Sequence, residues 1–103
     1  MSERPDPDFL RELEQVIRAR LEAQAPQSYT ARLVAGGKAR VAQKVAEEAV
    51  ETALASATDA GRNAVVGESA DLLYHLLVLL AVEGLDLADV AAELEARHRS
   101  LTR

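Results

Sequence analysis

The segment from residue 62 to residue 82 constrains the fold more than any other part of the chain. After Asp71 it is apolar at almost every position, so no polar face is left for solvent. A helix that is apolar all round has to be enclosed on all sides. The other helical segments of this 103-residue chain are short or alanine-rich and would struggle to enclose it alone. We therefore expect the helix to bury surface against a second copy of the chain.

Three further segments have helical periodicity. Apolar residues recur at helical spacing from residue 9 to about Gln24, and residues 38–58 are alanine-rich with larger apolar side chains at helical spacing. Asp86 can cap a short last helix. The pattern predicts an all-α fold, a bundle of four to five helices.

Glycines and a proline mark the expected connections. Gly61 and Gly84 are placed to end the helices before them. Residues 26–37, which include Pro26 and two glycines, are expected to form the longest irregular connection. We expect one domain over residues 1–103, with an ordered core over about residues 8–98.

Composition and charge exclude several classes of function. The chain has no cysteine, which rules out disulfides, thiolate zinc sites and thiol catalysis. Its net charge of −5 and lack of a basic stripe argue against nucleic-acid binding. The N-terminus lacks the features of a signal peptide, and the longest apolar run, residues 76–82, is far shorter than the roughly 18 residues that span a bilayer. We expect a soluble cytoplasmic protein with no membrane partner.

Two pairs of acidic residues stand on either side of a predicted turn at residues 59–61. Glu48 and Glu51 lie three residues apart before the turn, and Glu68 and Asp71 lie three apart after it, so each pair shares a helical face. Glu51 precedes the turn by about 12 Å of helix and Glu68 follows it by about 10 Å. If the two helices pack antiparallel, the four carboxylates meet at one level.

Four carboxylates in one place repel one another, and burial beside leucines makes their charge more costly. A divalent cation removes both problems, and oxygen ligands without cysteine favour Mg²⁺, with Mn²⁺ as a substitute. An isolated acid pair is usually a solvated face, and ion pairs from Lys44 to Glu47 or Glu48 would explain part of the first pair. They do not explain Glu68 and Asp71 at the head of the most apolar helix. We interpret the four acids as a metal site.

His75 follows Asp71 by four residues and so lies on the same helical face. It could contact a phosphate or a carboxylate just outside the metal ligands, although a lone histidine on an apolar helix is more often a core residue. The neighbouring Tyr74 is expected to pack, with its hydroxyl at an edge of the core.

The motif "EEAVE" followed by "ESAD" resembles the signature of the MazG-like all-α nucleoside triphosphate pyrophosphohydrolases. From about residue 9 to residue 97, "SYT", "QKVAEEAVE" and "ADLLYHLLVLL" resemble, more narrowly, the phosphoribosyl-ATP pyrophosphohydrolases of histidine biosynthesis. That family often has glycine where this chain has Ala46, a position without a ligand role.

This resemblance implies a MazG-like fold, usually a homodimer, and an ATP-binding hydrolase of the second step of histidine biosynthesis. The implied reaction is Mg²⁺-dependent hydrolysis of phosphoribosyl-ATP to phosphoribosyl-AMP and pyrophosphate. Glu48, Glu51, Glu68 and Asp71 match the family's metal-binding positions, and Glu47 matches the first glutamate of its motif.

Other roles follow from the chemistry of that reaction. Glu47 or Glu48 could take the proton of the attacking water as the catalytic base, and the sequence does not choose between them. The candidate substrate-binding residues are cations, hydroxyls and an imidazole: Lys44, Lys38, Arg40, Ser28, Tyr29, Thr30 and His75. Two alternatives stay open, a housecleaning (d)NTP pyrophosphatase of the same superfamily and a non-enzymatic helical dimerisation module.

Overall fold

The computed structural model describes residues 6–23 and 27–99, and within these ranges it contains five α-helices and no strand. The all-α prediction is confirmed. The end expected for the first helix, near Gln24, lies outside the described residues. The helices are α1 (Phe9–Ala23), α2 (Tyr29–Ala35), α3 (Lys38–Ala57), α4 (Arg62–Val82) and α5 (Leu87–His98).

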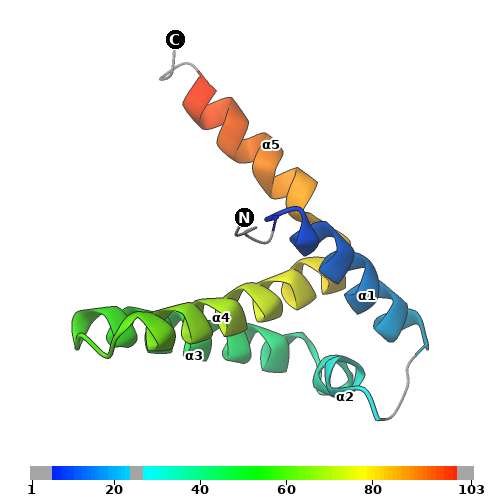
Figure 1. Cartoon of the computed structure of the whole chain (residues 1–103). Helices are drawn as coiled ribbons and strands as arrows, with labels where there is room; N and C mark the ends of the chain where they lie inside the picture. The colour runs from blue at the N-terminus through cyan, green and yellow to red at the C-terminus, as the bar shows by residue number, and fades with distance from the viewer. Residues whose placement is uncertain (1–5, 24–26, 100–103) are drawn as a thin grey trace, which may run out of the picture.

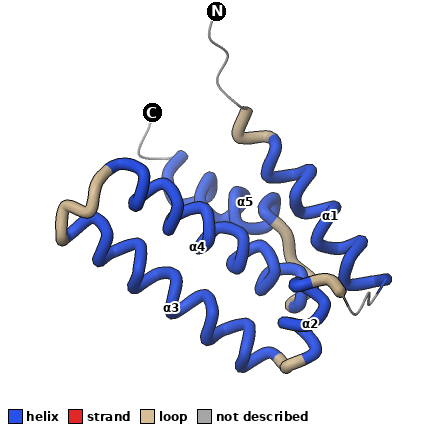
Figure 2. Tube along the Cα trace, turned by 60° about the horizontal axis from the view of Figure 1, so that its bottom comes forward, coloured by secondary structure: helices blue, strands red, loops and turns tan. Residues whose placement is uncertain are grey.

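The two longest helices, α3 and α4, form a hairpin that is the centre of the fold. They run side by side in Figures 1 and 2 and make the most extensive contact of any helix pair. The helices α1 and α2 pack across one end of the hairpin (Figure 2). One core cluster joins all four helices: Ile17, Leu33, Val41, Leu77 and Val78.

The turn between α3 and α4 differs in detail from the expectation. Thr58 is the C-cap residue of α3, and Asp59, not Gly61, takes the left-handed conformation after it, with φ 53°. The Ala60 N–H then donates to the Ala55 carbonyl at 3.0 Å and closes the helix. Aspartate tolerates this conformation, so glycine is not required there. Gly61, with φ 107°, instead precedes the first residue of α4.

The end of α4 and the start of α5 form as the sequence predicts. Gly84 has φ 74°, and the Leu85 N–H donates to the Leu80 carbonyl at 2.8 Å. Asp86 caps α5 by accepting the Asp89 N–H at 3.0 Å, while the Asp89 carboxylate accepts the Asp86 N–H at 3.0 Å. This reciprocal pair is a capping box.

The expectation of an irregular connection over residues 26–37 was wrong, because this stretch contains α2. Ser28 caps the helix by accepting the Ala31 N–H at 3.3 Å. Thr30 and Leu33 are buried, and Val34 packs partly against the core. The apolar spacing of a helix is therefore present, but it extends over only seven residues between a proline and two glycines.

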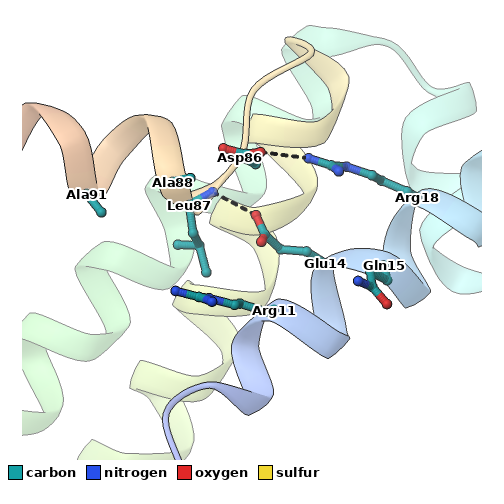
Figure 3. Close-up of a pocket in the computed structure, with 8 residues that line it drawn as sticks. All are labelled: Arg11, Glu14, Gln15, Arg18, Asp86, Leu87, Ala88 and Ala91. Carbon is teal, nitrogen blue, oxygen red and sulfur yellow. Dashed lines mark hydrogen bonds and ion pairs between the residues drawn. The ribbon is translucent and has the colours of Figure 1, made fainter.

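The start of α5 is tied to α1 by two polar contacts (Figure 3). Glu14 Oε2 accepts the Leu87 N–H at 2.7 Å, and an Arg18 guanidinium nitrogen lies 3.5 Å from Asp86 Oδ2. Beyond this junction, α5 projects away from the hairpin (Figure 1) and contains no fully buried residue. A cleft of about 420 Å³ lies between α1 and α5.

The cap of α5 should respond to acid. The Asp89 N–H, and to a smaller extent Arg18, lower the pKa of Asp86 below its ordinary value of 3.8. A lowered pKa adds stability above the unfolded-state value, and that contribution is lost as pH falls through the folded-state pKa.

Asp86→Asn should therefore unfold at lower denaturant concentration than the parent at pH 6, with the difference shrinking below about pH 3.8. Urea unfolding of both proteins at a series of pH values measures it. An Asp86→Asn difference that stays constant from pH 6 to pH 3 would contradict the prediction.

The apolar character of α4 is greater than the run of residues 76–82 indicated. Among the described residues, α4 is the one helix long and apolar enough to cross a membrane by length and composition alone, and core helices of soluble proteins pass the same test. The uninterrupted run of residues 76–82 understates the apolar length of α4. The helix is apolar on average over a longer window, which also includes Glu68 and Asp71. Only 22% of that window is buried within the chain.

Candidate metal centre

Three of the four acidic residues of the predicted metal site converge across the hairpin. Glu48 of α3 and Glu68 and Asp71 of α4 each offer a carboxylate oxygen, and these oxygens lie within 4.8 Å of one another. Glu48 is buried, Glu68 is partly buried and Asp71 is exposed. The cluster therefore opens to solvent on the Asp71 side and has its most enclosed ligand on α3.

The buried oxygens of this cluster fit a cation. Within the described part of the chain, Glu48 Oε2 and Glu68 Oε2 are buried and have no hydrogen-bond partner. An unpaired carboxylate oxygen away from water is costly, and two of them beside a third acid repel one another. A hard divalent cation such as Mg²⁺ would satisfy both oxygens, because it prefers carboxylate ligands.

The second oxygen of Glu48 has a different environment. Lys44 Nζ lies 3.5 Å from Glu48 Oε1, and His75 Nδ1 lies 3.7 Å from the same oxygen. Glu48 thus has one oxygen that faces nitrogen atoms and one that has no partner. The carboxylate is oriented so that the unpartnered oxygen is available to an ion.

Glu47 lies beside the cluster on the exposed side of α3. Its Oε1 is 3.9 Å from Lys44 Nζ, and its Oε2 accepts a hydrogen bond from Gln43 Nε2 at 2.9 Å. Lys44 therefore interacts with both glutamates of the motif, as its i,i+3 and i,i+4 spacing predicts. The contact from Gln43 was not anticipated, although its spacing of four residues from Glu47 could have indicated it.

Three other predicted site residues lie apart from the cluster. Glu51 is exposed and is not among the converging acids, although its spacing of three residues from Glu48 is the same as that between Glu68 and Asp71. Lys38 pairs with Glu83 at 3.2 Å, at the far end of the hairpin. Lys38 and Arg40 precede Glu48 by about 15 Å and about 12 Å along the axis of α3. Their roles in binding remain predictions.

The Ser-Tyr-Thr triplet joins α2 to the site. Ser28 caps α2, while the Tyr29 hydroxyl lies 2.8 Å from His75 Nε2. The hydroxyls of Thr30 and Tyr74 are hydrogen-bonded to each other, so Tyr74 packs with its hydroxyl satisfied. The sequence does not predict these two pairs, in which consecutive residues of α2 meet consecutive residues of α4.

The cleft between α1 and α5 contains none of the clustered acids (Figure 3). Two of its charged groups already pair with each other, Arg18 with Asp86, and Glu14 accepts the Leu87 N–H. Concavity alone would point to this cleft, but the unsatisfied buried carboxylates point to the α3–α4 hairpin. The three carboxylates are therefore the candidate functional site.

Comparison with known proteins identifies the family of the chain. Residues 10–98 match the family model described as phosphoribosyl-ATP pyrophosphohydrolase. A phosphoribosyl-ATP pyrophosphatase of Pyrobaculum neutrophilum is 59% identical over 92 residues, which are 89% of this chain and 97% of that protein. Its counterpart from Pyrobaculum islandicum is 56% identical, over the same shares of the two chains.

A longer relative contains the same region. The histidine biosynthesis bifunctional protein HisIE of Escherichia coli K12 is 53% identical over 91 residues, which cover 88% of this chain and 44% of that protein. The family match and the near-complete alignments with the shorter relatives lead to one conclusion, that the chain belongs to the phosphoribosyl-ATP pyrophosphohydrolase family.

Proposed function

We propose that the chain hydrolyses phosphoribosyl-ATP to phosphoribosyl-AMP and pyrophosphate with Mg²⁺ held by Glu48, Glu68 and Asp71, in the second step of histidine biosynthesis. The observation that carries the metal assignment is the pair of buried, unpartnered oxygens on Glu48 and Glu68 beside Asp71. Family membership supports the reaction. We keep Glu51 as a fourth ligand, which a change of its exposed side-chain rotamer would bring toward the cluster, and Mn²⁺ as a substitute ion.

A phosphoanhydride flanked by negative charges needs neutralisation and an in-line water more than a covalent nucleophile. When bound, Mg²⁺ supplies that neutralisation and stabilises the departing pyrophosphate. The role of the chain is to hold the carboxylates in place and to provide a cation, Lys44, next to them.

Of the two candidate bases, Glu47 is better suited to take the proton of the attacking water. Its carboxylate is exposed to water, and Lys44 lies beside it, whereas Glu48 is buried, with one oxygen beside Lys44 and His75 and the other without a partner. A general base has to reach the water from which it takes the proton. We therefore propose Glu47 as the base and Glu48 as a ligand.

We further propose a homodimer in the cytoplasm. Large apolar side chains are exposed along the α3–α4 hairpin, although this hairpin is the centre of the fold. They are Val50, Leu54, Val66 and Leu73. Together with the small buried share of α4, this surface fits a second copy of the same hairpin, since such an isologous contact would enclose α4.

The substrate assignment is tested by turnover. Purified protein with Mg²⁺ should hydrolyse phosphoribosyl-ATP with a kcat/KM at least about 100-fold above that for ATP, dATP, dCTP or dUTP, because a specific site discriminates by several polar contacts. Release of pyrophosphate is the measurement, with Glu68→Gln as the inactive control. A preference for a free dNTP would instead favour the housecleaning pyrophosphatase, and no turnover of any nucleotide would favour the dimerisation module.

A further inference from the structure

The contact between Tyr29 and His75 connects α2 to the carboxylate cluster. The Tyr29 hydroxyl lies 2.8 Å from His75 Nε2, and the two rings meet edge to face, with centroids 5.8 Å apart and an interplanar angle of 82°. His75 is buried, while Tyr29 is 45% exposed. The tyrosine thus holds the outer edge of a buried imidazole.

The other edge of the imidazole faces the cluster. His75 Nδ1 lies 2.8 Å from the backbone carbonyl of Asp71. A carbonyl oxygen only accepts hydrogen bonds, so Nδ1 carries a hydrogen whether the ring is neutral or charged. The same nitrogen lies 3.7 Å from Glu48 Oε1. The orientation of the ring therefore sets where a polar N–H points relative to Glu48.

The position of this N–H affects which oxygen of Glu48 is left without a partner. Lys44 and His75 both face Oε1, and Oε2 has no partner among the described residues. A ring that turned about its side-chain bonds would withdraw the N–H from Oε1 and from the Asp71 carbonyl. Glu48 could then rotate, and Oε2 would no longer be kept as the oxygen without a partner.

We propose that Tyr29 is a positioning residue, whose hydroxyl fixes the His75 ring and thereby keeps Glu48 Oε1 beside Lys44 and His75 and leaves Oε2 free for an ion shared with Glu68 and Asp71. This inference rests on the proposed metal site and adds a third helix to it. It also gives the tyrosine of the "SYT" motif a role in the protein before any nucleotide binds. Outer contacts of this kind orient the residues that hold a metal, and their removal costs 10- to 100-fold in affinity in characterised sites.

The competing role for Tyr29 is direct contact with substrate, and the two roles predict different measurements. A tyrosine that only binds substrate affects KM and leaves the affinity of the substrate-free protein for metal unchanged. A positioning tyrosine changes that affinity in the absence of any nucleotide.

The test is Mn²⁺ titration of substrate-free protein, followed by electron paramagnetic resonance of the free ion. Tyr29→Phe keeps the ring and removes only the hydroxyl, and we expect it to weaken Mn²⁺ binding by about 10-fold. The ¹⁵N spectrum of His75 at one fixed pH, without metal, should also change at Nε2, because that nitrogen loses its partner.

Tyr74→Phe is the matched control. It removes a hydroxyl from the same α2–α4 junction, that of the residue bonded to Thr30, and its ring remains edge-on to His75 at 5.5 Å. We expect Mn²⁺ affinity within about twofold of the parent, since neither imidazole nitrogen is touched. Equal losses in both variants would mean that docking of α2 matters and not the Tyr29 hydroxyl, which would overturn the proposal.

Two further outcomes separate this inference from the function on which it rests. Unchanged Mn²⁺ affinity in Tyr29→Phe, with lost affinity in Glu68→Gln, overturns the positioning role and leaves the metal site intact. Parent protein that binds no Mn²⁺, or Glu68→Gln protein that binds it as well as the parent does, overturns both.

Discussion

Replacing Glu68 by glutamine is expected to abolish turnover of phosphoribosyl-ATP, with kcat lower by on the order of 10³-fold or more. Glu68 provides one of the two buried oxygens without a partner, and an amide in its place removes a negative charge that the ion needs. Mn²⁺ affinity should fall with the activity. Pyrophosphate release and Mn²⁺ titration measure the two losses.

The same variant should remain folded. Loss of one charge from three converging carboxylates lowers their repulsion, so the thermal midpoint without metal should be equal to or above that of the parent. Glu22→Gln, at an exposed site on α1, is a control of the same chemistry that should change neither activity nor metal affinity. Retained Mn²⁺ affinity in Glu68→Gln would contradict the assignment of the metal site, whatever happens to turnover.

Replacing Leu54 by arginine is expected to convert the homodimer into a monomer. Leu54 is 54% exposed on the hairpin, in the surface that we assign to the second copy. An arginine there would be buried in the interface without a partner, and the dissociation constant should rise by on the order of 10³-fold. Sedimentation equilibrium over a range of protein concentrations measures the change.

Leu94→Arg provides the comparison for that experiment. Leu94 is 50% exposed, but it lies on the projecting helix α5, outside the proposed surface. Its variant should remain dimeric. If Leu94→Arg dissociates the dimer and Leu54→Arg does not, α5 and not the hairpin forms the contact.

The long elements of this fold could be predicted because their sequence signals are local. The ends of α4, the glycine after it and the capping residue Asp86 all follow from residues within one turn of the feature they define. The helix α2 was missed because seven residues give too few repeats of the helical period, and flanking glycines and proline outweighed them.

The site could be predicted only in part, for a similar reason. Two acid pairs about equally far from a turn predict that carboxylates on facing helices meet, and Glu48, Glu68 and Asp71 do so. The contact of Tyr29 with His75 spans 46 residues and depends on how α2 packs against α4. No local sequence pattern encodes a contact between residues so far apart in the chain. The exposed position of Glu51 likewise depends on side-chain geometry that residue spacing does not determine.

The short turn between α3 and α4 determines more than the direction of the chain. Each residue added to a helix rotates the next side chain by about 100° and advances it by 1.5 Å. An insertion between Thr58 and Gly61 that extended either helix would carry Glu68 and Asp71 around the helix axis, away from Glu48. Residues 58–61 thus set how α3 and α4 are rotated relative to each other, and so how their carboxylates would surround an ion. These four residues lie about 10 Å along the helix from Glu68, the nearest acid of the cluster. The length of this turn therefore fixes how the carboxylates of α3 and α4 face each other.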